Sequence, residues 1–175
     1  MNSPFESHLV GFLPNLRRFA LSISRSASIA DDLVQITCEK ALKNRGSYTD
    51  GTNLDAWLLQ ILRNSWIDQT RRDGGQGKHA PIEDLPELPD PVEGVSAEQR
   101  LVLQDTLKAI DRLPEDQREV LLLICVEELS YKDVSATLDV PIGTIMSRLA
   151  RARKKIAQDL GINGAVRRSP DEGGV

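Results

Sequence analysis

Residues 129–155 read LSYKDVSATLDVPIGTIMSRLARARKK, and this stretch decides the fold of the C-terminal part of the chain. Apolar side chains recur at helical spacing on either side of Pro141, so each segment predicts a short helix with one buried face. The expected buried positions are Val134, Leu138, Ile145, Leu149, Ala152 and Ile156. Ser130, with Asp133 three residues later, predicts the start of the first helix. Two such helices joined by a tight turn over 138–141 indicate a helix-turn-helix.

The second of these predicted helices is strongly basic. Between Thr144 and Lys155 it carries five Lys or Arg side chains and no acidic one. Cations on the face opposite an apolar stripe suit the phosphates and base edges of a DNA major groove. The predicted DNA-binding residues are Thr144, Ser147, Arg148, Arg151, Arg153, Lys154 and Lys155. A plainer interpretation of the same charges is that they complement the helix dipole and keep the surface solvated.

The composition of the 175 residues favours a helical protein of the cytoplasm. Aromatic residues make up only 4% of the chain, which suits cores built of Leu, Ile, Val and Ala on helices. No apolar run approaches the roughly 20 residues that a membrane-spanning helix needs. The N-terminus has no basic segment followed by an apolar block, so we expect no secretory signal.

The reactive side chains are too scattered to form a catalytic or metal site. Cys38 and Cys125 lie far apart in apolar helical contexts, and His8 and His79 are isolated. Metal-ligand spacing and a nucleophile with a matching base are both missing from the sequence. We therefore expect buried, reduced thiols, no metal, no cofactor and no enzymatic activity.

Acidic residues are concentrated in the middle of the chain. Residues 73–99 carry seven Asp or Glu against one basic side chain, and the stretch is rich in Gly and Pro. Such a composition predicts a linker without a lasting helical period. The fold prediction is therefore all-α, with two small helical domains joined by a flexible linker. The expected boundaries are 1–72 for the first domain, 73–95 for the linker, 96–160 for the second domain and 161–175 for a flexible tail.

Five further helices are expected before the helix-turn-helix. They cover 5–23, 29–42, 54–72, 97–113 and 115–127. Pro14 should bend the first helix or shift its start. Ser28 or Asp31 should lie near the start of the second, with Asp31 and Asp32 in its first turn, where acids suit the dipole.

Several motifs in this order resemble one known family. They are Asp31-Asp32-Leu33-Val34-Gln35, Ala56-Trp57-Leu58 with Arg63-Asn64 and Ile67-Asp68 then Arg71-Arg72, Leu113-Pro114-Glu115-Asp116-Gln117-Arg118-Glu119-Val120, Leu129-Ser130-Tyr131, Gly143-Thr144-Ile145, Ser147-Arg148-Leu149 and Ala152-Arg153. Together they resemble the extracytoplasmic-function (ECF) class of bacterial sigma factors in the sigma-70 family. The resemblance implies a dissociable subunit that directs core RNA polymerase to promoters, as a monomer when free. It further implies a stress or envelope response under the control of an anti-sigma factor.

The resemblance also implies roles for particular residues. The N-terminal domain would open and read the minus-ten element, and the C-terminal domain would read the minus-thirty-five element as duplex. Core polymerase would contact Asp31, Asp32, Leu33 and Gln35, and minus-ten DNA would contact Asn53, Arg63, Asn64, Arg71 and Arg72. The loop 44–53 would hold a flipped base. The acids could instead serve as helix caps, and Trp66 could either stack on a base or pack against a helix.

The chain departs from the family pattern at Ile36, Asp139, Met146 and Ala150, where an acid, a glycine and polar or basic residues are usual. Asp139 suits the left-handed turn, whereas Met146 could either touch a thymine methyl or pack. An alternative function is a sigma-like module that sequesters an anti-sigma factor without initiating transcription. A dimeric helix-turn-helix regulator would leave the N-terminal half without a role.

Overall fold

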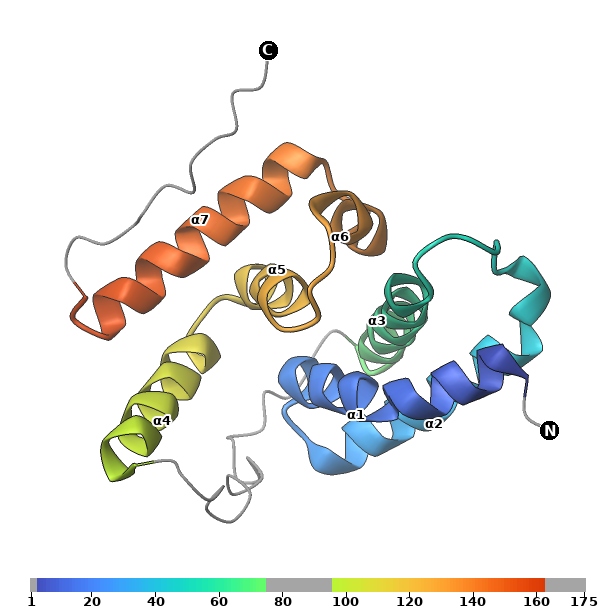
Figure 1. Ribbon diagram of the computed structural model, residues 1–175, viewed down its shortest axis with the longest axis horizontal. Coiled ribbons are helices and arrows are strands. Elements are labelled where there is room, and N and C mark those ends of the chain that lie inside the picture. Colours follow the sequence, from blue (N-terminus) through green and yellow to red (C-terminus); the bar gives the residue numbers. More distant parts are fainter. Residues whose placement is uncertain (1–2, 75–95, 163–175) are drawn as a thin grey trace.

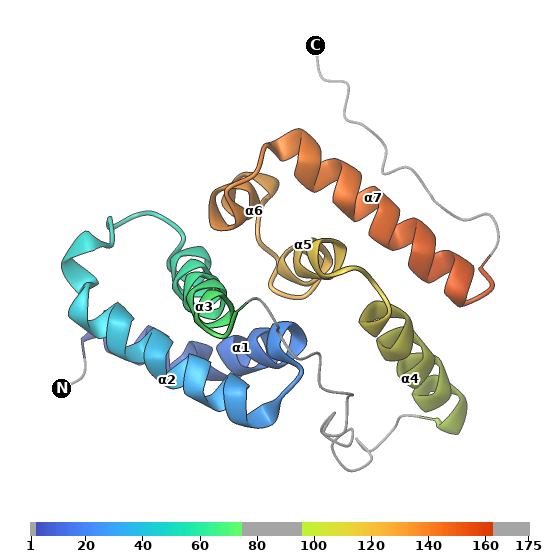
Figure 2. The same cartoon turned by 180° about the vertical axis from the view of Figure 1, so that it is seen from behind.

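The computed structural model describes residues 3–74 and 96–162, and all of their regular secondary structure is helical (Figures 1 and 2). The elements are α1 (Pro4–Ser24), α2 (Ala27–Lys43), the short 3₁₀ turn η1 (Arg45–Ser47), α3 (Leu54–Arg72), α4 (Ala97–Asp111), α5 (Glu115–Cys125), α6 (Tyr131–Leu138) and α7 (Ile142–Asp159). The all-α prediction is confirmed. Most of the predicted linker, 75–95, and nearly all of the predicted tail lie outside the described residues.

Helices α1, α2 and α3 pack together around a core of Leu and Phe side chains. The largest fully buried members are Leu16, Phe19, Leu33, Leu58, Leu59 and Leu62. Helix α1 begins with a capping box between Ser3 and Glu6 and continues through Pro14, so the predicted shift of its start does not occur. It ends at Arg25, whose φ of 56° is left-handed.

The start of α2 differs from the prediction. Its N-cap is Ser26, whose side chain accepts a hydrogen bond from the Ile29 amide, so neither Ser28 nor Asp31 caps the helix. The first turn therefore contains no acidic residue, and helix-dipole stabilisation does not explain Asp31 and Asp32. Asp31 instead pairs with Arg17 of α1 at 2.8 Å, and Asp32 is exposed.

Helices α5, α6 and α7 pack on one another, and α4 lies against α7. The predicted apolar stripe is confirmed, because Ile145, Leu149 and Ala152 of α7 are buried with Val134 and Leu138 of α6. Ser130 caps α6 by accepting from the Asp133 amide. Asp139 ends that helix at φ 54° and ψ 48°, as its tolerance of the left-handed region predicts.

The two groups of helices touch each other. Helix α3 lies against α6 and α1 lies against α5, as both views of the chain show (Figures 1 and 2). The sequence predicts two small domains joined by a flexible linker, and among the described residues the two groups of helices also pack against each other. No described helix is long and apolar enough to cross a membrane.

The two cysteines differ from each other. Cys38 is half-buried, and burial raises the pKa of its thiol. Cys125 is exposed at the end of α5, so the prediction that it is buried is wrong. Both are free thiols.

Candidate nucleic-acid interface

The basic face of α7 projects away from the core. Its buried small and aliphatic side chains pack against α5 and α6, and the opposite face of the helix carries polar and basic residues. All seven predicted DNA-binding residues lie on α7, and each has a side chain that is exposed or half-buried. The exposed members are Ser147, Arg151, Arg153, Lys154 and Lys155, and Thr144 is half-buried. Met146 is 54% exposed on the same helix, so it does not pack into the core.

Arg148 is tied to its own group of helices. Its Nε lies 3.2 Å from a carboxylate oxygen of Asp116 at the start of α5. Arg151 donates to the Ser147 hydroxyl at 3.3 Å, and Lys155 lies 3.9 Å from Asp159. These contacts orient the cations, and at partly exposed sites they are weak enough to exchange for phosphate.

Two of the predicted minus-ten residues are engaged by the C-terminal helices. The Asn53 side chain caps α3 by accepting from the Ala56 amide and donates to the Asp133 carboxylate of α6 at 3.1 Å. Arg63 donates to a carboxylate oxygen of Glu119 in α5 at 3.3 Å. In contrast, Asn64, Arg71 and Arg72 are exposed. Asn53 is itself exposed, so only Arg63 of the predicted set is partly buried, and both have hydrogen-bond partners on the C-terminal helices.

Glu119 is a buried acid with an unusual environment. Burial raises the pKa of its carboxyl group, Glu115 acts in the same direction, and Arg63 and Arg118 oppose the rise. The net direction is upward, so the attraction of the cations does not fully offset the loss of hydration. Sequence patterns could not reveal the pairing of Glu119 with Arg63, because the two residues are 56 positions apart.

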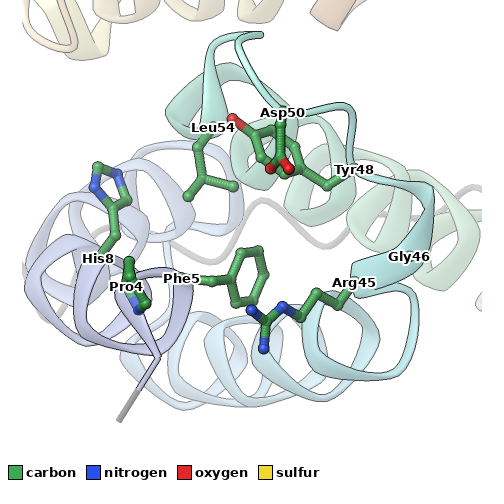
Figure 3. A pocket seen from close by; sticks show the side chains of 8 residues that line it. All are labelled: Pro4, Phe5, His8, Arg45, Gly46, Tyr48, Asp50 and Leu54. Atoms are coloured by element: carbon green, nitrogen blue, oxygen red, sulfur yellow. The ribbon is translucent and has the colours of Figure 1, made fainter.

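A cavity of about 740 Å³ lies beside the loop between α2 and α3 (Figure 3). It is lined by Pro4, Phe5, His8, Arg45, Gly46, Tyr48, Asp50 and Leu54. The Arg45 guanidinium lies over the Phe5 ring, 5.2 Å from its centroid, and Tyr48 packs against Trp57 with ring centroids 5.5 Å apart. Sequence reasoning singled out the loop but missed the contribution of α1, since only the fold brings Phe5 and His8 to it.

The Tyr48 hydroxyl donates to the Thr52 carbonyl at 2.7 Å, and the Thr52 hydroxyl donates to the Thr49 carbonyl. These bonds hold the loop in shape while Asp50 stays exposed. The cavity therefore combines aromatic faces with a cation and a carboxylate, the groups that stack on and hydrogen-bond a nucleobase.

The predicted polymerase contacts on α2 include both exposed and buried residues. Asp31, Asp32 and Gln35 are exposed, with Asp31 paired to Arg17 at 2.8 Å. Leu33 is 0% exposed in the core, so its prediction as a direct contact is wrong. Leu33 packs in the core beneath the exposed side of α2. Trp66 is half-buried against the core, and its indole N–H points at Glu115 at 3.5 Å, which favours packing over base stacking.

Comparison with known proteins agrees with this arrangement. The Sigma-70 region 2 model matches residues 10–75, and the Sigma-70, region 4 model matches 103–163. The chain is 38% identical over 169 residues to the ECF RNA polymerase sigma factor EcfG of Rhodopseudomonas palustris (strain TIE-1), covering 94% of this chain and 89% of that protein. The two matched regions define a sigma-70-type protein. More narrowly, the chain belongs to the family of ECF RNA polymerase sigma factors, which are transcription initiation factors and not enzymes.

Two solved structures of proteins from Bartonella quintana bear on the alternative function, a sigma-like module that sequesters an anti-sigma factor. The sigma factor RpoE, solved with the anti-sigma factor NepR, matches with a TM-score of 0.75 and 38% identity, covering 91% of this chain and 98% of that one. The anti-anti-sigma factor PhyR, also solved with NepR, matches with a TM-score of 0.53 and 19% identity, covering 88% of this chain and 50% of that one. The second likeness shows the shared fold alone, so the mimic is not favoured.

Proposed function

We propose that this chain directs core RNA polymerase to promoters, with α7 reading the minus-thirty-five element. The observation that carries this assignment is the exposed cationic face of α7, held against α5 and α6 by its apolar stripe. Thr144, Ser147 and Arg148 lie near the N-terminal end, from which a recognition helix contacts base edges. Arg151, Arg153, Lys154 and Lys155 then contact phosphates, which position the helix without selecting sequence.

The cavity beside the loop 44–53 receives the flipped base of the minus-ten element. The half-buried Tyr48 offers an aromatic ring, Arg45 over the Phe5 ring offers a cation, and the exposed Asp50 offers a hydrogen-bond acceptor. Asn64, Arg71 and Arg72 hold the neighbouring backbone of the melted strand, together with Asn53 and Arg63 once these are released. Residues 1–72 form the unit that performs this step, and 96–160 form the duplex-reading unit.

Core polymerase docks on the exposed side of α2. Asp31, Asp32 and Gln35 present carboxylates and an amide there, and the helix dipole gives no competing reason for the two acids. The chain works as a monomer in the cytoplasm, where polymerase and promoters are found. An anti-sigma factor holds it inactive until a stress signal, by analogy with the complex of RpoE and NepR.

Run-off transcription tests the assignment. Core polymerase and the purified chain are incubated with a template library whose 40 or so upstream base pairs are randomised, and the transcripts are sequenced. The expected result is start sites preceded by two shared elements that core polymerase alone does not select. Transcripts no different from those of core polymerase would contradict the proposal and favour the sequestering module.

A matched pair of variants assigns the upstream element to α7. Arg151→Ala should lower the yield from selected templates, because it removes a cation from the DNA-facing side. Lys108→Ala, on α4, removes the same charge from an exposed side chain outside the predicted DNA-binding set and should leave the yield unchanged. Equal losses for both variants would remove α7 from the DNA.

A further inference from the structure

The N-terminal half of α7 carries exposed apolar side chains as well as polar ones. Ile142 is 44% exposed and Met146 is 54% exposed, and Ala150 is exposed as well. These three residues are spaced four apart, so they line up along one side of the helix. We call this line of Ile142, Met146 and Ala150 the exposed apolar edge. It is separate from the buried stripe of α7, since none of its members lies in the core.

The exposed apolar edge lies beside the cations of the same helix. The next residue along its line is Lys154, and the neighbouring line consists of Gly143, Ser147, Arg151 and Lys155. The helix carries no acidic side chain from 144 to 155. Cations so close to the edge favour a polyanion over an apolar protein surface as the molecule that covers it. When the cations hold α7 on DNA, the edge is therefore carried into the same groove.

The polar side chains at this end of α7 already have partners within the protein. The Ser147 hydroxyl donates to the Thr144 carbonyl at 3.1 Å and accepts from Arg151 at 3.3 Å. The Nε of Arg148 lies 3.2 Å from the Asp116 carboxylate. The side chains of the exposed apolar edge are open but form no conventional hydrogen bonds. Any base that the edge selects must therefore present an apolar group to it.

Duplex DNA presents one such group in the major groove. The C5-methyl group of thymine is the apolar feature of the base edges there, and small or aliphatic side chains contact it. Met146 suits this contact because its thioether side chain is flexible and polarisable. Gly143 adds no side chain beside it, and nothing lies within 4 Å of the point that a Cβ of Gly143 would occupy. A base edge can thus approach Met146 from that side.

We propose that Ile142 and Met146 contact the methyl groups of thymines in the upstream promoter element, and that Ala150 extends this contact along the groove. The chain then selects thymine at these positions by an apolar contact and not by a hydrogen bond. The thymine contact rests on the proposed function, because it concerns the same helix on the same DNA. It adds two residues, Ile142 and Met146, to those that determine which promoters are bound.

Uracil substitution tests this contact in the full chain bound to core polymerase. Deoxyuridine replaces each thymidine of the selected upstream element in turn, on either strand, which removes the methyl group and keeps the base-pairing hydrogen bonds. At least one replacement should weaken binding by the parent about fourfold, the size expected when one apolar carbon loses its burial. The downstream element is left unchanged, so strand opening does not enter the comparison. Fluorescence anisotropy measures the affinities.

Two variants connect the lost methyl group to the exposed apolar edge. Met146→Ala and Ile142→Ala each shorten an exposed side chain, so the fold should stay intact. At the responsive thymine, one of them should bind the unmodified duplex about fourfold more weakly and lose little more on uracil substitution, because the contact is already gone. Val102→Ala is the matched control, since Val102 is 59% exposed on α4. It should bind and respond to uracil as the parent does.

Three results would overturn the thymine contact. They are an upstream element without thymine on either strand, thymines whose replacement by uracil leaves the parent's affinity unchanged, and a uracil response that persists in both Met146→Ala and Ile142→Ala. The second result is also the one expected if the edge covers a protein partner instead of DNA. All three leave the proposed function standing, whereas a chain that selects no upstream element contradicts both.

Discussion

The two candidate DNA surfaces of this sigma factor are built from the same residue types but differ in what surrounds them. On α7 the cations are mostly exposed, and the Arg148 pair to Asp116 stays within one group of helices. Around α3, Asn53 and Arg63 are bound by acids from the other group. A sequence motif thus specifies which side chains are present, whereas tertiary contacts determine which of them are free to bind DNA.

The largest expected effect separates the exposed side of α2 from its buried side. Leu33→Ala should lower the free energy of unfolding by about 2–5 kcal/mol, because it leaves a cavity in a close-packed core. Gln35→Ala, two residues away and exposed, should change it by less than about 0.5 kcal/mol. Urea unfolding followed by circular dichroism measures both. A Leu33→Ala variant as stable as Gln35→Ala would place Leu33 on the surface after all.

The next effect concerns the open surface on α7. Arg148→Ala should weaken binding to a selected upstream duplex by about 1–3 kcal/mol if Arg148 contacts a base, and otherwise should reduce the salt slope by about one. Asp116→Asn should strengthen binding, because it releases the guanidinium without removing it. Fluorescence anisotropy at several salt concentrations distinguishes the outcomes. Unchanged binding for both variants would show that Arg148 does not face DNA.

A smaller effect is expected at Asn53, which both caps α3 and donates a hydrogen bond to Asp133 of α6. Asn53→Ala removes both the α3 cap and the bond to Asp133, and should cost about 1 kcal/mol of unfolding free energy. Asn53→Asp keeps a capping oxygen but places a second carboxylate against Asp133. It should therefore weaken the packing of α3 against α6 while the helical structure of α3 stays intact. Hydrogen exchange of α3 and α6 amides reports the two effects, and equal protection in both variants would argue against this separation.

The smallest effect is a pH dependence at the covered surface. Because the pKa of Glu119 is raised above its ordinary 4.5, the folded chain holds this proton more tightly than the unfolded chain does. Its contribution to stability is therefore present below about pH 4.5 and is lost as the pH rises through the raised pKa. Arg63, Glu115 and Arg118 face the same carboxyl group and set the size of the change.

Unfolding of the parent and of Glu119→Gln across pH 4–7.5 isolates this contribution. The stability of the parent relative to Glu119→Gln should fall as the pH rises, since only the parent pays for ionising the buried group. A relative stability that rises with pH would mean that the attraction of Arg63 outweighs the loss of hydration at Glu119.

The sequence was sufficient for the local parts of this fold. Helical spacing placed the seven α-helices of residues 3–74 and 96–162 to within a few residues, and the stripe of Ile145 and Leu149 identified the packed face of α7 correctly. Asp139 was recognised as a left-handed turn residue from its side chain alone. These features depend on neighbours in the chain, which a sequence displays directly.

The parts that could not be predicted depend on distant partners. Leu33 lies in a family motif, yet its 0% exposure is set by packing among α1, α2 and α3. The cavity needs Phe5 beside Tyr48, and the covered state of Arg63 needs Glu119 from another group of helices. The cap at Ser26 instead of Ser28 shows that even a local boundary shifts when several hydroxyl residues compete for it.

The left-handed residue at the end of α1 has a consequence for engineering. Glycine adopts this conformation without strain, and a stabilising redesign would choose it over Arg25, which is strained by about 1 kcal/mol there. The same exchange would delete the guanidinium that reaches Asp111. The exchange would therefore relieve backbone strain and at the same time remove a bond between the N-terminal and C-terminal helices, so the two effects on stability cannot be separated at this position.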